Sequence, residues 1–275
     1  MSGKVAIVTG ATGALGEATA TGLARHGWSV LLGCRDETRG NRTRSRIAAS
    51  APQAEVEVRP LDLSSPTSIR SMVSSFAERY DRLDALIHTA AIFSSRRKIT
   101  PEGWELMFAT NHLGPFLLTR LLQDTQGGSK PLRILVVTAP STTQVEFDDP
   151  QGERQFRALW AFGASKMCNL LFTYALSRRL QGSSSTANAF HPGLVKSNLM
   201  KEAPAPMRLL TNLISSPPDR AAASLVSLAT SLEYASVSGR FFKGEQVIQS
   251  SAYSLDPANQ ERLWDLSARL VGLAS

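Results

Sequence analysis

Cysteine, histidine and long apolar runs are all scarce in this sequence of 275 residues. Its two cysteines, Cys34 and Cys168, lie far apart and have no C-x-x-C partner, which argues against a disulfide framework and a zinc knuckle. The four histidines are scattered at spacings that form no metal site, so we predict no bound metal. No apolar stretch approaches the roughly 20 residues needed to span a bilayer. We therefore expect a cytoplasmic protein that has no membrane partner.

The net charge of +7 is the main feature of the composition. No recognisable nucleic-acid-binding module and no basic stripe interleaved with aromatic residues accompanies it, so we predict no nucleic-acid partner. Anionic small ligands fit this charge better. With 43% hydrophobic residues, a chain of this length can bury a substantial core, and nothing in it indicates a second globular unit. We predict one domain over residues 1–275.

A glycine-rich turn close to the N-terminus is the most informative motif. The apolar run at residues 5–8 is typical of a strand buried on both faces, and a helical pattern follows at residues 15–26. Gly10 permits a tight turn, Gly13 lets backbone N–H groups approach a pyrophosphate, and Gly16 lets the helix pack close to the strand. The helix N-terminus adds unpaired N–H groups and a positive dipole end. This context predicts a dinucleotide site that also includes Thr12 and Leu15.

Strands and helices alternate along the rest of the chain. Strands are predicted at residues 29–34, 56–61, 83–88, 133–138, 186–190 and around 239–242, and helices at 69–80, 103–122, 158–180, 220–231 and 259–270. This alternation predicts an α/β fold, namely a Rossmann-type doubly wound parallel sheet of about seven strands with helices on both faces. We interpret residues 198–220, rich in proline and apolar residues, as a substrate lid; a loosely packed surface helix is the alternative.

Arg35 stands just past the carboxyl end of the strand at residues 29–34, where the adenosine ribose lies in a doubly wound sheet. An NAD-specific site normally places a carboxylate there, whereas a guanidinium can bind a 2′-phosphate. Arg35, with Arg39 as a helper, therefore predicts that NADP(H) is preferred over NAD(H), although the neighbouring Asp36 points the other way. Further strand-end residues are predicted to line the cofactor: Asp62, Leu63, Ala90, Ala91, Pro192, Gly193, Val195 and Ser197.

Two of these positions have a purely structural interpretation as well. Asp62 could instead cap the helix that begins near Pro66, a role that Ser64 or Ser65 could also fill. Asn111, in an apolar helix and just before Gly114, goes against helix propensity, and such conflicts often mark function. The alternative is a kink in which Asn111 bonds to freed backbone groups.

Together these motifs resemble the short-chain dehydrogenase/reductase family over essentially the whole chain, although Ala14 stands where classical members usually carry glycine. The stretches 34–36, 111–114 and 263–267 look like its retinol-dehydrogenase-like branch, whose members commonly prefer NADP. The resemblance also implies a homodimer or homotetramer built on the helices at 103–122 and 158–180.

The family's catalytic logic is a serine and a tyrosine that hold the substrate oxygen, supported by a lysine and an asparagine. The resemblance assigns the last two roles to Lys166, which would also bond the nicotinamide ribose, and Asn111. Phe162 occupies the tyrosine position and Ala139 the serine position, so both hydroxyls are missing. Ser141 could replace them only if the chain bends at Pro140, because in an extended segment it lies roughly 6–7 Å beyond Ala139.

We therefore expect an NADP(H)-dependent oxidoreductase that acts on a carbonyl or alcohol group of a small apolar molecule. Its proton would come from a water held near Asn111 and Lys166, or from the substrate itself, because the Ser/Tyr pair is degenerate. Two alternatives stay open. One is a non-redox biosynthetic enzyme, such as a cyclase, isomerase or dehydratase, and the other is a catalytically inactive NADP-binding sensor.

Overall fold

The computed structural model describes residues 3–127, 130–197, 199–203 and 215–274, which fold around one sheet of eight strands. The order across the sheet is β3-β2-β1-β4-β5-β6-β7-β8, and only the pairing of β8 with β7 is antiparallel. This confirms the predicted Rossmann-type fold. The strands are β1 (Val5–Thr9), β2 (Ser29–Cys34), β3 (Val56–Pro60), β4 (Ala85–His88), β5 (Arg133–Val137), β6 (Thr186–His191), β7 (Phe241–Lys243) and β8 (Gln246–Val247).

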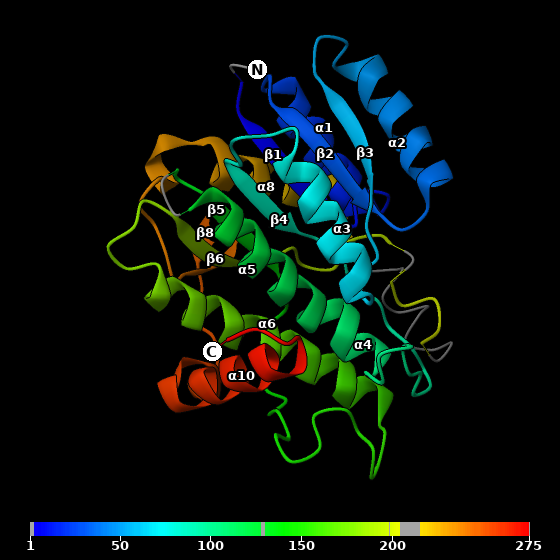
Figure 1. The fold of residues 1–275 in the computed structure, drawn as a ribbon, viewed down its shortest axis with the longest axis vertical. Helices are drawn as coiled ribbons and strands as arrows, with labels where there is room; N and C mark the ends of the chain where they lie inside the picture. The colour runs from blue at the N-terminus through cyan, green and yellow to red at the C-terminus, as the bar shows by residue number, and fades with distance from the viewer. Residues whose placement is uncertain (1–2, 128–129, 198, 204–214, 275) are drawn as a thin grey trace.

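Helices cover both faces of the sheet (Figure 1). One face carries α3 (Pro66–Ala77), α5 (Gly114–Gln126) and α6 (Ala158–Arg179), and the other carries α1 (Ala14–Arg25), α2 (Glu37–Ser50) and α8 (Asp219–Thr230). The shorter elements α4 (Leu106–Phe108), η2 (Leu232–Tyr234) and α9 (Ala252–Leu255) lie in the connections, and α10 (Pro257–Leu270) is the last helix of the chain. None of the described helices is long and apolar enough to cross a bilayer.

The central strand β1 explains why two separate cores form. Val5 and Ile7 point into the core beneath α3, α5 and α6, whereas Ala6 and Val8 point into the core beneath α1 and α8. Successive strand residues face opposite sides of a sheet, so an unbroken apolar run is required where both sides are covered. The strand order reverses at β1, between β2 and β4, and the carboxyl ends of these strands therefore border the crevice in which such sheets bind ligands.

The helix predicted at residues 103–122 is wrong in its first part. Gly103 has a φ of 84°, outside the helical region, and a regular helix begins only at α4. A π-helical turn, η1 (Ala109–Leu113), separates α4 from α5 and contains Asn111. Such turns insert one extra residue and occur frequently at functional sites. The helix-propensity conflict at Asn111 therefore marks a real irregularity of the backbone.

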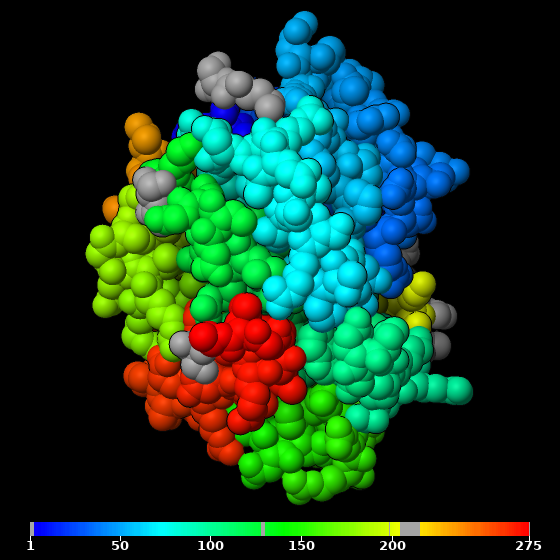
Figure 2. All heavy atoms as spheres, in the orientation of Figure 1, coloured from blue at the N-terminus to red at the C-terminus, as the bar shows by residue number. Residues whose placement is uncertain are grey.

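The C-terminal helix α10 lies against both α5 and α6. Its Trp264 ring stacks on Phe172 of α6 and meets the edge of Phe116 of α5, with centroid separations of 6.1 and 5.0 Å. Glu261 adds ion pairs to Arg178 and Arg179. Figure 2 shows α10 in red, seated on the green surface of these helices. The predicted subunit interface on α5 and α6 is thus covered, around Trp264, by a helix of the same chain.

Most of the segment interpreted as a lid, including its apolar residues 207–214, lies outside the described residues. Its flanks are placed, however. Val195 forms a parallel bridge with Ser216, and Lys196 N–H donates to the Ser216 carbonyl over 3.0 Å. Glu202, just before the undescribed residues, pairs with Lys98 and accepts a hydrogen bond from the Ser95 N–H. Both ends of the segment are therefore anchored beside the carboxyl edge of the sheet.

Candidate functional site

The glycine turn after β1 is packed so closely that side chains would not fit at two positions. Gly10 has a φ of 65°, and a Cβ on it would lie 2.7 Å from the Cα of Ala90. A Cβ on Gly16 would collide with the Gly10 carbonyl and the Thr89 hydroxyl. The turn is closed by a hydrogen bond of 2.9 Å from Gly13 N–H to the Gly10 carbonyl. The backbone of β1, the start of α1 and the segment after β4 are therefore in close contact.

The N-terminus of α1 fits an anionic group. Gly13 is the N-cap and provides no side-chain hydrogen bond, so the first N–H groups, close to Thr12 and Leu15, are open to a ligand. Glu17 in the first turn would oppose an anion, but its carboxylate is paired with Arg46 at 2.6 Å on α2. This cradle and its electrostatics fit the pyrophosphate of a dinucleotide.

The end of β2 carries the residues that bear on cofactor choice. Arg35 is exposed and makes no hydrogen bond or ion pair within the described residues. Arg39 reaches back to the glycine turn, where its guanidinium donates to the Thr12 carbonyl over 3.2 Å. Asp36 is the N-cap of α2, and its carboxylate accepts from the Arg39 N–H at 3.0 Å. Asp36, the carboxylate that by its position favoured NAD, therefore has a structural role as a helix cap.

Asp62 and Leu63 form the turn after β3. The Asp62 carboxylate accepts from both the N–H and the hydroxyl of Ser64, while the N-cap of α3 is Ser65. Capping of α3, the structural alternative for Asp62, is therefore wrong. The Leu63 carbonyl occupies the space that a Cβ on Gly114 would fill, so this turn packs directly on the helix that follows the π-helical turn.

Asn111 is fully buried and fully bonded. Its Oδ1 accepts from the Ile92 N–H at 2.8 Å, and its Nδ2 donates to the Ile92 carbonyl and to Ser165 Oγ, each at 3.0 Å. The side chain thus ties Ile92, in the segment after β4, to Ser165 of α6, and it does not bond to freed backbone of its own helix. Ser165 is not among the residues that the sequence predicted for the site. Its adjacency to Lys166 was the available signal.

Lys166 lies one helical turn after Phe162, and its ammonium sits over the Phe162 ring at 5.2 Å from the centroid. Lys166 is only 6% exposed, and burial lowers its pKa to about 8. The Phe162 ring also meets the edge of Phe93 at 5.7 Å. On this side it belongs to an apolar cluster built from four segments of the chain, which includes Phe93, Met107, Phe156, Leu199, Met200 and Ala203.

The segment after β5 brings Ser141 to α6. Thr138, which precedes Ala139, donates its hydroxyl to the Lys166 carbonyl over 2.8 Å. Ser141 donates its own hydroxyl to the Gly163 carbonyl over 2.9 Å, so it lies near Phe162 but has its proton engaged. Thr143 Oγ1 fills the space beside Gly163 where a Cβ would be. The Ser141 hydroxyl therefore lies close to Phe162, but its proton is already donated to the Gly163 carbonyl.

The remaining predicted residues follow β6. Gly193 has a φ of 74°, which turns the chain after Pro192, and Ser197 Oγ accepts from the Leu199 N–H at 3.4 Å. His88, also at a strand end, is 2% exposed and bonds Thr119 at 2.9 Å, and burial lowers its pKa to about 3. His88 is therefore a buried structural residue.

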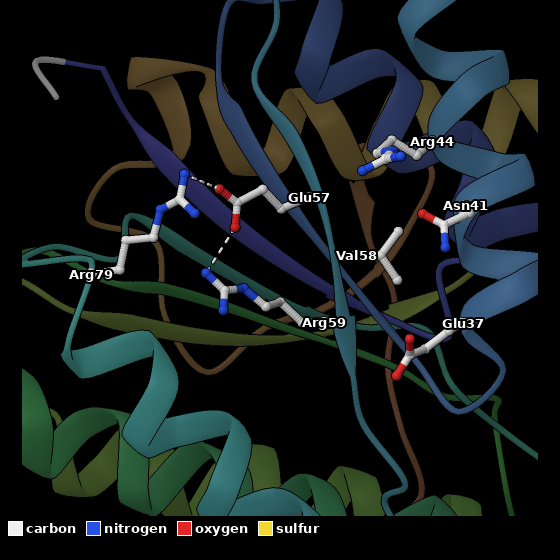
Figure 3. Close-up of a pocket in the computed structure, with 7 residues that line it drawn as sticks. All are labelled: Glu37, Asn41, Arg44, Glu57, Val58, Arg59 and Arg79. Carbon is white, nitrogen blue, oxygen red and sulfur yellow. Dashed lines mark hydrogen bonds and ion pairs between the residues drawn. The ribbon is translucent and has the colours of Figure 1, made fainter.

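The surface hollow shown in Figure 3 lies elsewhere, around the edge strand β3. Glu57 is paired there with Arg59 and Arg79 on one side of the strand, while Val58 faces α2 on the other. Charged side chains on an edge strand discourage pairing with another chain. This hollow contains none of the predicted site residues.

Comparisons with known proteins agree with this geometry. A sequence model of the short chain dehydrogenase family matches residues 4–208. The chain belongs to the short-chain dehydrogenase family. Human retinol dehydrogenase 14 is 36% identical, over 99% of this chain and 88% of its own length. Human retinol dehydrogenase 11 is 37% identical, over 99% and 87%. The retinol-dehydrogenase-like branch is thereby confirmed.

Two solved structures share the fold. An uncharacterised protein from Mycobacterium paratuberculosis has a TM-score of 0.77 and 30% identity, covering 98% of this chain and 94% of its own. A variant of actinorhodin polyketide ketoreductase, crystallised with NADPH, has a TM-score of 0.68 and 22% identity, covering 88% and 95%. The fold shared with these structures therefore extends over most of the chain.

Proposed function

We propose that this protein is an NADPH-dependent reductase, and in reverse a dehydrogenase, of small apolar carbonyl and alcohol compounds. The observation that carries the proposal is the pairing of a complete dinucleotide cradle with a buried lysine beside an apolar cluster. Similarity to retinol dehydrogenases supports an apolar substrate of that general kind.

The proposed preference for NADP(H) over NAD(H) rests on the end of β2. Arg35 is free to meet a 2′-phosphate, and Arg39 already lies at the glycine turn. Asp36 is held as a helix cap and does not compete for the ribose hydroxyl. A guanidinium that forks onto a phosphate is among the stronger polar contacts in proteins.

The predicted site residues divide the work. The glycine turn, with Thr12 and Leu15, would bind the pyrophosphate, while Asp62 and Leu63 would border the adenine and Lys166 the nicotinamide ribose. Ala90, Ala91, Pro192, Gly193, Val195 and Ser197 would line the rest of the cofactor. When bound, the reduced nicotinamide supplies a hydride. Asn111 positions α6 through Ser165, and the segment 198–220 would close over the substrate.

The homodimer or homotetramer remains a proposal. Because α10 covers α5 and α6 around Trp264, subunits that met on these helices would have to displace it or pack around it. Light scattering on the purified protein measures the mass directly, and a mass of one chain would show that α10 takes the place of a second subunit.

The test is a comparison of NADPH and NADH binding by fluorescence, followed by turnover assays against retinal and a panel of apolar ketones and aldehydes. We expect tighter binding of NADPH and measurable oxidation of it by at least one carbonyl compound. Tight binding without any turnover would favour the NADP-binding sensor. Product formation without net change in NADPH would favour the non-redox enzyme.

A further inference from the structure

The reaction centre proposed above lacks the hydroxyl groups that normally hold the substrate oxygen, and the neighbouring serines do not supply them. Ser94, Ser141 and Ser165 each donate to a backbone carbonyl, at 2.8, 2.9 and 2.7 Å respectively. Asn111 has both its amide donor and its acceptor engaged. A developing negative charge on oxygen still requires a donor.

Lys166 Nζ is in a different situation. Within the described residues it makes no hydrogen bond and no ion pair, and it forms a cation–π contact with the face of the Phe162 ring. A tyrosine at residue 162 would add a hydroxyl at the far end of this ring, within the same site. Phenylalanine has no such oxygen to offer the ammonium. The hydrogen atoms on Nζ are therefore available to a substrate.

We propose that the Lys166 ammonium itself holds the substrate oxygen and donates the proton of the reduction, in place of the missing tyrosine. This proposal rests on the proposed reductase function and deepens it. The carbonyl carbon accepts the hydride from the reduced nicotinamide, which is thereby oxidised, and the π electrons of the C=O bond move to oxygen. That oxygen takes a proton from Nζ, and the neutral amine regains its proton from water.

The electrostatics of Lys166 suit this role. Burial alone lowers its pKa to about 8, and a general acid works best when its pKa lies near the operating pH. The pKa of Lys166 is lowered by burial and not by a neighbouring charge. The ionisable groups on the surrounding elements are Arg133 on β5, His191 on β6, Glu105 beside α4, His112 on η1, Tyr253 on α9, Glu261 on α10, and His88 at the neighbouring end of β4.

The pH dependence follows from the sign of this shift. Reduction requires the protonated ammonium, so kcat at saturating NADPH should fall as the pH rises through about 8. Alcohol oxidation requires the neutral amine, so its kcat should rise over the same range. In the Phe162→Tyr variant the hydroxyl takes over the transfer, and both profiles should change.

The decisive variant is Lys166→Arg, because a guanidinium keeps the positive charge and hydrogen-bond donors but does not release a proton. We expect kcat for carbonyl reduction to fall by about 10²–10⁴-fold, with a change of only a few-fold in the KM for NADPH. Lys130→Arg is the matched control, since Lys130 lies on the surface in an ion pair with Asp81. Thr143→Val removes the hydroxyl beside Gly163, the competing donor.

A second readout does not depend on turnover. Competitive trace acetylation of the cofactor-free protein, with peptide mass spectrometry, measures the pH at which each lysine becomes a nucleophile. We expect a midpoint near 8 for Lys166. A midpoint in the ordinary lysine range, above 10, would remove the basis for its role as an acid.

The outcomes separate the two proposals. If the unmodified protein oxidises NADPH and Lys166→Arg keeps its kcat, the proton donor is another group and this inference is overturned while the reductase function stands. A large loss in Thr143→Val, with a small one in Lys166→Arg, would assign the role to Thr143. If no carbonyl compound is reduced, the reductase function fails and the role of Lys166 fails with it.

Discussion

Two stretches at the same edge of the sheet differ in how they build their chemistry. The turn after β1 uses backbone N–H groups and the absence of side chains, whereas the stretch from Ala139 to Lys166 would use side-chain oxygens and an amine. In the first, Gly10 and Gly16 are fixed by packing against Ala90 and Thr89. In the second, the Phe162 ring contacts both Phe93 and the Lys166 ammonium. The backbone turn therefore depends on the packing of the fold, whereas the chemistry of the second stretch depends on which side chains stand at its positions.

The comparison predicts that the backbone site breaks with the smallest possible side chain. Gly10→Ala should lower the free energy of unfolding by about 2–5 kcal/mol, from a strained positive φ and an overpacked contact, and should abolish NADPH binding. Thermal denaturation and a fluorescence titration measure the two effects.

Gly27→Ala is the matched control for this change. Gly27 also has a positive φ, 76°, but a Cβ there meets nothing within 4 Å. It should cost only about 1–2 kcal/mol and leave NADPH binding intact. Equal effects of the two substitutions on binding would show that the close approach at Ala90 does not shape the cofactor site.

The side-chain site, by contrast, should gain activity when its hydroxyls are restored. We expect the double variant Phe162→Tyr, Ala139→Ser to raise kcat for carbonyl reduction by less than the about 10²–10⁴-fold that a general acid contributes, because Lys166 already supplies the proton, with little change in melting temperature. Steady-state kinetics with NADPH and a carbonyl panel test this. An unchanged kcat, with NADPH binding intact, would mean that the present proton donor already matches a tyrosine.

The fold and the close packing of the glycine turn were open to prediction because they depend on periodic patterns and on glycine. The run at residues 5–8 predicted a doubly covered strand, and Val5 to Val8 do face two cores in alternation. The two-residue strand β8 and the π-helical turn at Asn111 could not be read in this way, because neither has a period of its own. The helix at 103–122 was therefore placed too early.

The candidate site was less predictable where it depends on contacts between distant residues. Nothing in the sequence indicates that Asn111 reaches both Ile92 and Ser165, or that Ser141 donates to Gly163. Arg39 and Thr12 are likewise 27 residues apart and meet only because α2 packs back on α1. Patterns along the chain locate strand ends, but hydrogen bonds across the fold decide which side chains remain free.

The smallest expected effect concerns cofactor choice at the end of β2. Arg35→Glu should weaken NADPH binding by about 10–100-fold, since a charge-assisted contact contributes about 1.5–3 kcal/mol, and should leave NADH binding within a few-fold. Arg44→Glu is the matched control, because Arg44 carries the same charge on α2 but lines the hollow around β3 instead. Titrations with both nucleotides at low and high salt separate a direct phosphate contact from the general field, which salt screens. If the two variants weaken NADPH equally, the basic surface acts only through net charge. A loss confined to Arg35→Glu would show that the 2′-phosphate contacts Arg35 directly. Cofactor choice would then depend on this side chain, whereas pyrophosphate binding depends on the backbone of the glycine turn.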